Sequence, residues 1–136
     1  MFQTQIEVRT RGKGLLLITR EIEQALRGNL PQTGLLHLFL LHTSASLLIQ
    51  ENADPTARQD LEEFLERLAP EGQSWHRHTL EGPDDTTSHL KSALTNSSLN
   101  IPISNCALGL GTWQGIYLWE HRRSAHLRRL TLTVLS

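Results

Sequence analysis

The segment LLHLFLLHTSASLLIQ, residues 35–50, decides the fold of this chain. Leu35 to His42 and Ala45 to Gln50 are almost continuously apolar, which predicts two strands separated by a turn or bulge at Thr43-Ser44. Strands with so few polar positions are typical of sheets covered on both sides. We therefore expect both faces of these two strands to be buried.

Shorter runs on either side of this segment predict more strands. Ile6 and Val8 alternate with charged residues, as in a half-buried strand. Further apolar or alternating runs are Leu15–Ile18, Trp75–Leu80, Ile116–Trp119 and Leu130–Val134. Ile101-Pro102-Ile103 fits only an edge or irregular strand, because proline has no amide hydrogen to donate to a neighbour.

Three segments carry helix signals. The first runs from a cap at Thr19 through Leu26 and stops at Gly28. The second starts at Asp54-Pro55, a cap followed by proline, and its leucines and phenylalanine recur at helical spacing until Pro70. The third is expected over Thr86 to Leu94, with Asp85 as its cap.

Strands outnumber helices and do not alternate with them regularly, which favours an α+β domain over a doubly wound nucleotide-binding fold. We expect a two-sheet, mostly antiparallel β-sandwich with three helices. The 136 residues contain no repeat or linker and predict a single domain, residues 1–136.

Composition excludes several function classes. Thirteen Lys and Arg residues against 14 Asp and Glu residues are too balanced for a general nucleic-acid or membrane-surface binder. The single cysteine, Cys106, rules out an intramolecular disulfide and favours a buried, unreactive thiol in a reducing compartment. With no apolar stretch long enough to span a membrane and no visible signal peptide, a cytoplasmic location is expected.

Common catalytic motifs are absent. Gly109, Gly111 and Gly115 resemble a dinucleotide fingerprint, but Gln114 stands where its third glycine belongs and a strand follows. What remains is a set of polar clusters at the ends of apolar strands.

Two of these clusters lie near residues 42–54. In the first, His42, Ser44 and Ser46 could present hydrogen-bond donors to an anion or a nitrogen to a metal; the alternative is a satisfied core histidine in a turn. In the second, Asp54 needs no role beyond capping the helix that follows.

The third cluster spans Glu81 to His89. Asp84 and Asp85 followed by His89 one helical turn later form an ordinary arrangement for a metal, and a helix N-terminus here would also attract phosphate. The alternative is a helix cap beside a surface histidine.

The fourth cluster ends an apolar strand and contains Glu120, His121 and Arg122; the alternative is a solvated strand end. His76 and His78 lie on one face of the expected strand Trp75–Leu80, a spacing that can chelate a metal, but both are expected to be surface residues. His37 and His126 are expected to be structural.

Together these segments resemble the signature of the YjbQ-like family, in order along nearly the whole chain. The matching segments are His42-Thr43-Ser44-Ala45-Ser46-Leu47, Glu51-Asn52-Ala53-Asp54-Pro55, Glu81-Gly82-Pro83-Asp84-Asp85 with His89, and Gly111-Thr112-Trp113-Gln114-Gly115-Ile116-Tyr117-Leu118 with Glu120-His121-Arg122. One departure is Thr86-Thr87-Ser88, where the family usually has Met-Pro-Ala.

The resemblance implies a small α+β sandwich protein that forms homotrimers. It also implies secondary thiamine-phosphate synthase activity, which joins hydroxymethylpyrimidine diphosphate to a thiazole phosphate and releases pyrophosphate. A divalent metal, Mg²⁺ or Zn²⁺, would assist this reaction by neutralising the leaving group.

Carried onto this chain, the expected catalytic residues are His42, Asp85, His89 and His121. The expected substrate-binding residues are Ser44, Ser46, Asp84, Lys91, Gln114 and Arg122, and the expected metal ligands are His42, His89 and His121. The partners implied are a small phosphorylated substrate and two further copies of the chain, without nucleic acid or membrane. Two other functions are also considered: a metal- or phospholigand-binding module without turnover, and a scaffold in which these residues only cap helices.

Overall fold

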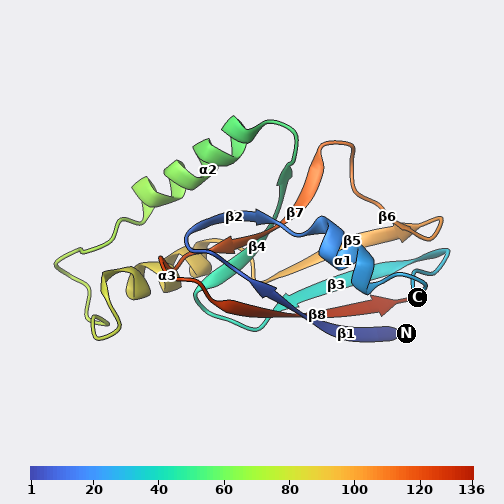
Figure 1. The fold of residues 1–136 in the computed structure, drawn as a ribbon, viewed down its shortest axis with the longest axis horizontal. Coiled ribbons are helices and arrows are strands. Elements are labelled where there is room, and N and C mark those ends of the chain that lie inside the picture. Colours follow the sequence, from blue (N-terminus) through green and yellow to red (C-terminus); the bar gives the residue numbers. More distant parts are fainter.

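Eight strands form two antiparallel sheets that pack against each other, with three helices outside or at the ends (Figure 1). The computed structural model describes all 136 residues. The large sheet has the order β1-β8-β3-β5-β6, with bounds Phe2–Arg9, Leu127–Leu135, Thr33–Leu40, Ser98–Ser104 and Ala107–Leu108. The small sheet has the order β2-β7-β4, with bounds Gly14–Leu17, Gln114–Glu120 and Ala45–Glu51. The predicted two-sheet α+β fold is confirmed.

The main core fills the space between the two sheets. On β8, the inward positions Leu130, Leu132 and Val134 alternate with outward residues, and they pair in register with β3. From the small sheet, Leu47 and Leu118 face the same layer and are fully buried. This layer fixes the positions of β4 and β7, whose ends carry the polar clusters.

Helices cover the outer face of the small sheet. α2 (Pro55–Leu68) places Leu65 against Leu15, Tyr117 and Trp119, which form a second, smaller core. α3 (Pro83–Leu94) lies beside β4, where Ser92 donates a hydrogen bond to the Ala45 carbonyl oxygen. α1 (Thr19–Ala25) lies at the far end of the molecule from α3 (Figure 1). None of the three helices is long and apolar enough to cross a membrane.

Burial of the two central strands differs from the prediction. β4 is buried on both faces over Ala45 to Leu47, because it lies between the large sheet and α3. β3 is buried on one face only: Phe39, on the open face of the large sheet, is 44% exposed. Continuous apolar character therefore overstated the burial of β3.

The predicted strand at Trp75–Leu80 is wrong, because this segment forms no ladder with either sheet. Trp75 is 63% exposed and Leu80 is 99% exposed, so the segment is a surface loop that leads into α3. Cys106, expected to be buried, is exposed in the tight turn between β5 and β6, where its φ of 59° is left-handed.

Two predicted helix caps are also wrong. Thr19 uses its hydroxyl to accept a hydrogen bond from the Ile116 amide instead of capping α1. α3 begins earlier than expected, at Pro83, after Gly82 with φ of 100°. Asp85 therefore lies inside the first turn of α3. The predicted cap at Asp54 is confirmed, since its carboxylate accepts the Thr56 amide at 2.9 Å.

Replacing Leu118 by alanine should lower the free energy of unfolding by about 2–5 kcal/mol, because it leaves a cavity between the sheets. Leu68→Ala, a matched change at the exposed end of α2, should stay within about 0.5 kcal/mol of wild type. Urea unfolding followed by circular dichroism measures both; equal losses would contradict this account of the core.

Candidate functional site

The polar clusters meet at the N-terminus of α3. Gly82 lets the loop turn sharply into the helix, and Pro83 at the first helical position is compatible with that start. The next two residues, Asp84 and Asp85, are both buried. The end of β7 supplies the third side of the site through Arg122.

Arg122 holds the two carboxylates. Its Nε donates to Asp84 Oδ2 at 2.9 Å and its Nη1 donates to Asp85 Oδ1 at 2.8 Å. The Arg123 amide also donates to Asp84 Oδ2 at 2.9 Å. Burial alone would raise the pKa of Asp84, but these hydrogen bonds and the guanidinium charge outweigh it and lower that pKa. Both carboxylates are therefore ionised at neutral pH.

The second oxygen of Asp85 faces two histidine rings. His78 Nε2 lies 2.5 Å from Asp85 Oδ2 and His89 Nε2 lies 3.3 Å from it. The three ligating atoms all lie within 4.8 Å of one another, and they form the one group of three or more His, Cys, Asp or Glu residues in the chain with this geometry. Burial alone would raise the pKa of Asp85, and the neighbouring histidines and Arg122 lower it.

The tautomer of His89 is fixed by its other nitrogen. Nδ1 lies 2.8 Å from the carbonyl oxygen of Thr43, which can only accept a hydrogen bond, so Nδ1 carries a proton. Nε2 of the neutral ring would then turn a lone pair towards the Asp85 carboxylate. A cation between the two atoms, either a proton or a metal ion, removes that repulsion.

The donor set of this cluster, named here the His78–Asp85–His89 cluster, fits a divalent metal. Two imidazole nitrogens and one carboxylate suit Zn²⁺ or a similar transition metal, whereas Mg²⁺ prefers oxygen ligands alone. The bond from His89 Nδ1 to a backbone carbonyl is the support that metal-binding histidines usually have.

The structure brings together only part of the expected metal set. His89 lies in the cluster, but His42 Nε2 accepts the Arg129 amide at 2.8 Å, and His121 Nε2 pairs with Ser46 Oγ at 2.7 Å. Burial lowers the pKa of His42 and keeps its ring a hydrogen-bond acceptor. Neither ring shares a group of ligating atoms with His89.

His78 is the residue that sequence reasoning missed. It was expected to be a surface residue on a strand, and its side chain is indeed half exposed, but the loop folds back over α3 and brings the ring onto Asp85. The Thr86 hydroxyl fixes that loop by donating to the His78 carbonyl oxygen. The spacing of Asp85 and His89 was visible in sequence, whereas the spacing of His78 from His76 suggested a different pair of ligands and gave no sign of a contact with Asp85.

Of the expected substrate-binding residues, two lie at the site and four lie elsewhere. Asp84 and Arg122 are at the site but bind each other, so they position the cluster. Ser46 and Lys91 are buried behind it, and the Ser44 carbonyl oxygen accepts bonds from the His121 amide and Arg128. Gln114 begins β7, about 23 Å along the strand from His121 at roughly 3.3 Å per residue. Its side chain accepts a hydrogen bond from the Gly111 amide and lies outside the site.

A cleft of about 440 Å³ lies on the other side of α3, and we name it the α2 cleft. It is lined by α2, the turn before β2, Lys91 of α3, Trp119 of β7, and His121 just after that strand. His121 is 1% exposed, and its Nδ1 has no hydrogen-bond partner, which costs about 1–3 kcal/mol for a buried polar group. Burial lowers the pKa of His121 to about 3, so the ring is neutral.

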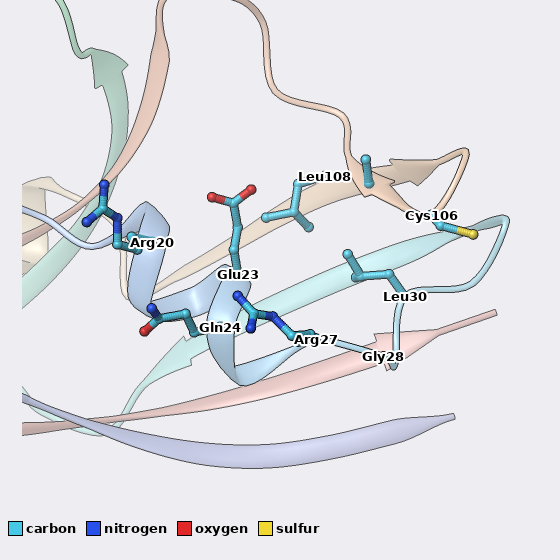
Figure 2. A pocket seen from close by; sticks show the side chains of 9 residues that line it. Arg20, Glu23, Gln24, Arg27, Gly28, Leu30, Cys106 and Leu108 are labelled. Atoms are coloured by element: carbon cyan, nitrogen blue, oxygen red, sulfur yellow. The ribbon is translucent and has the colours of Figure 1, made fainter.

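A larger hollow, of about 710 Å³, lies at the opposite end of the molecule, between α1 and the β5–β6 hairpin (Figures 1 and 2). Figure 2 shows Arg20 and Arg27 on one side of it and Cys106 at its rim. It contains no metal-ligating cluster and no unpaired buried polar atom, so the chemistry of the chain is concentrated around α3.

Comparison with known proteins identifies the family. A family model described as "UPF0047 protein YjbQ-like" matches residues 4–136. The chain belongs to the YjbQ-like family. UPF0047 protein sll1880 of Synechocystis sp. is 46% identical over 97% of this chain and 90% of its own length. UPF0047 protein YjbQ of Salmonella typhimurium is 45% identical over 98% of this chain and 96% of its own length.

Solved structures of similar proteins have the same fold. Conserved hypothetical protein TT1486 from Thermus thermophilus is 40% identical and superimposes with a TM-score of 0.86 over 97% of this chain and 99% of that one. Hypothetical protein APE1520 from Aeropyrum pernix is 30% identical, with a TM-score of 0.89 over 100% of this chain and 99% of that one. These YjbQ-like relatives carry names that state no activity, so function must be argued from the residues.

Acidification should reveal the buried neutral His121. Below its ordinary value of 6.5 the unfolded chain binds a proton that the folded chain excludes until about pH 3. Stability from this group is therefore complete above pH 6.5 and falls towards pH 3 by up to about 1.4 kcal/mol per pH unit.

Urea unfolding of wild type and His121→Gln at several pH values measures this slope. The variant should lose stability less steeply than wild type, while Leu68→Ala, which changes no titratable group, should keep the wild-type slope. Parallel curves for wild type and His121→Gln would contradict the burial argument.

Proposed function

We propose that this protein is an enzyme with secondary thiamine-phosphate synthase activity that uses a divalent metal held by His78, Asp85 and His89. The cluster of two imidazoles around a buried, ionised carboxylate is the observation that carries the metal part of the proposal. The reaction itself comes from the resemblance of the signature segments and is supported by membership of the family. The metal ligands differ from the first expectation, because His78 and Asp85 replace His42 and His121.

The reaction demands stabilisation of a multiply charged leaving group. Pyrophosphate departs with negative charge that a bound divalent cation would neutralise in the transition state. The N-terminus of α3, which begins beside the cluster, adds a weaker positive potential from its unpaired amides.

The residues of this chain have distinct tasks in the proposal. One carboxylate oxygen of Asp85 faces the metal position, and its other oxygen accepts a hydrogen bond from Arg122. The guanidinium group therefore orients the Asp85 carboxylate as a metal ligand. Asp84 holds Arg122 in turn. Because Arg122 is committed to two carboxylates, we assign it a positioning role and leave direct contact with phosphate to other donors.

Two further expectations are kept as proposals. The homotrimer implied by the resemblance would cover large apolar side chains that are exposed in the single chain, among them Phe64, Trp75 and Leu94. In such a trimer, a neighbouring copy would supply the Gln114 turn to the site. A cytoplasmic location agrees with an exposed, unpaired Cys106.

Elemental analysis of untagged protein tests the metal site. Wild type should contain close to one transition-metal ion per chain. The variants His78→Ala, Asp85→Asn and His89→Ala should each bind metal at least about 10–100-fold more weakly, because even the removal of a residue that only supports a ligand has an effect of this size. His37→Ala, a matched change far from the cluster, should keep the wild-type content. Loss in His42→Ala and His121→Ala with retention in His78→Ala would restore the first expected set.

Product formation tests the reaction. Wild type should form thiamine phosphate from the two substrates, and Asp85→Asn should lower the rate roughly 100-fold or more because leaving-group stabilisation is lost. Detection of thiamine phosphate by chromatography measures both rates, and His37→Ala serves as the folded control.

The second candidate is a metal- or phospholigand-binding module without turnover. It is favoured by the absence of an exposed nucleophile beside the cluster: Ser46 Oγ pairs with His121 but is fully buried. Metal binding without product over a broad panel of phosphorylated substrates would support this candidate and reject the enzyme.

A further inference from the structure

The α2 cleft contains an unusual excess of buried hydrogen-bond donors. Lys91 is 2% exposed, and its ammonium group has three hydrogens but one acceptor, the Glu66 carboxylate. Glu66 also accepts from Lys13 at 3.1 Å, so one carboxylate serves two ammonium groups. The next carboxylate, Glu71, is likewise shared, between Lys13 and Arg123.

The other carboxylates around the α2 cleft already have partners of their own. Glu62 accepts the Leu15 amide at 2.7 Å, and Glu63 pairs with Arg67 on the solvent side of α2. Glu120 also lines the cleft, and its carboxylate binds Arg128 and Thr10. Each of these carboxylates therefore has a donor of its own, whereas the Lys91 ammonium group keeps hydrogens without an acceptor.

His121 adds a neutral donor on the floor of this cleft. Ser46 Oγ has no acceptor other than His121 Nε2, at 2.7 Å, so the serine hydrogen points to Nε2. The neutral ring then carries its own hydrogen on Nδ1, the atom without a partner. A buried N–H beside a buried ammonium group is complementary to an oxygen-rich anion.

We infer that the α2 cleft binds a phosphoryl oxyanion through Lys91, Lys13 and His121 Nδ1, and that the Glu66 carboxylate occupies the anion position until the ligand displaces it. Glu66 is suited to this exchange because its side chain is 44% exposed and lies on the solvent side of a buried partner. The cleft volume of about 440 Å³ accommodates a small phosphorylated molecule. Trp119 supplies an apolar wall for the rest of such a molecule.

This inference rests on the proposed function in one respect: it gives the phosphorylated substrate a binding place separate from the His78–Asp85–His89 cluster. It makes a counter-intuitive prediction about charge. Removal of the Glu66 charge should strengthen anion binding, because the ligand no longer competes with an internal carboxylate. If the ion pair is open in about a tenth of molecules, its removal lowers the apparent Kd about tenfold.

Isothermal titration with inorganic pyrophosphate tests this on the protein as purified. Glu66→Gln should bind about tenfold more tightly than wild type, and Glu7→Gln, the same change on β1 of the large sheet, should bind as wild type does. Lys91→Met, which keeps the length of the buried side chain, should abolish binding. Weaker binding of pyrophosphate by Glu66→Gln would overturn the inference, as would wild-type binding by Lys91→Met.

A second arm separates this site from the metal cluster. Pyrophosphate binding that survives in His78→Ala and disappears in Lys91→Met supports the α2 cleft whatever the metal analysis shows. The reverse pattern places the anion on the metal and overturns the inference, but leaves the proposed function intact. Circular dichroism of each variant confirms that it is folded. If Lys91→Met does not fold, Lys13→Gln provides a second variant of the α2 cleft, and it is expected to weaken pyrophosphate binding.

Discussion

The geometry of the whole site depends on one guanidinium group. Asp84 and Asp85 are adjacent, buried and ionised, and two such carboxylates repel each other and lose hydration. Arg122 offsets both costs by binding one oxygen of each. Since Arg122 follows β7 and the two aspartates begin α3, this interaction also attaches the helix to the small sheet and leaves the second oxygen of Asp85 facing the histidines.

α3 serves two places because its polar side chains point in two directions. Asp85 and His89, one turn apart, face the loop that carries His78. Lys91 lies on the buried side and reaches the α2 cleft. The departure at Thr86-Thr87-Ser88 fits this arrangement: the Ser88 hydroxyl donates to the Asp85 carbonyl oxygen at 2.6 Å, and the Thr86 hydroxyl binds the His78 carbonyl. Hydroxyl groups thus fasten the loop and first turn where the family usually has a proline.

Local patterns predicted the parts of the structure that local forces determine. The apolar runs indicated where most of the strands lie along the chain, and Asp54-Pro55 marked the start of α2. Both signals act within a few residues, since they depend on alternation and on capping. The predicted strand Trp75–Leu80 is wrong because this segment pairs with neither sheet, and only its first and last residues are apolar. The sequence offered His78 as a chelator only together with His76, because its contact with Asp85 is made through a loop whose path depends on Thr86 and Gly82.

The pairing of Lys91 with Glu66 lay equally beyond sequence reasoning, since the partners are 25 positions apart and lie on different helices. Yet the charge pattern around it has a simple logic. The His78–Asp85–His89 cluster has an excess of electron-pair donors and calls for a cation, whereas the α2 cleft has an excess of hydrogen donors and calls for an anion. His121 and Arg122, consecutive on the chain, belong one to each place, so the end of β7 connects them through a single peptide bond. In the proposed function, a metal ion and a phosphorylated substrate must be bound close together. Two consecutive side chains that point to different sites allow a small domain to place a cation site and an anion site side by side.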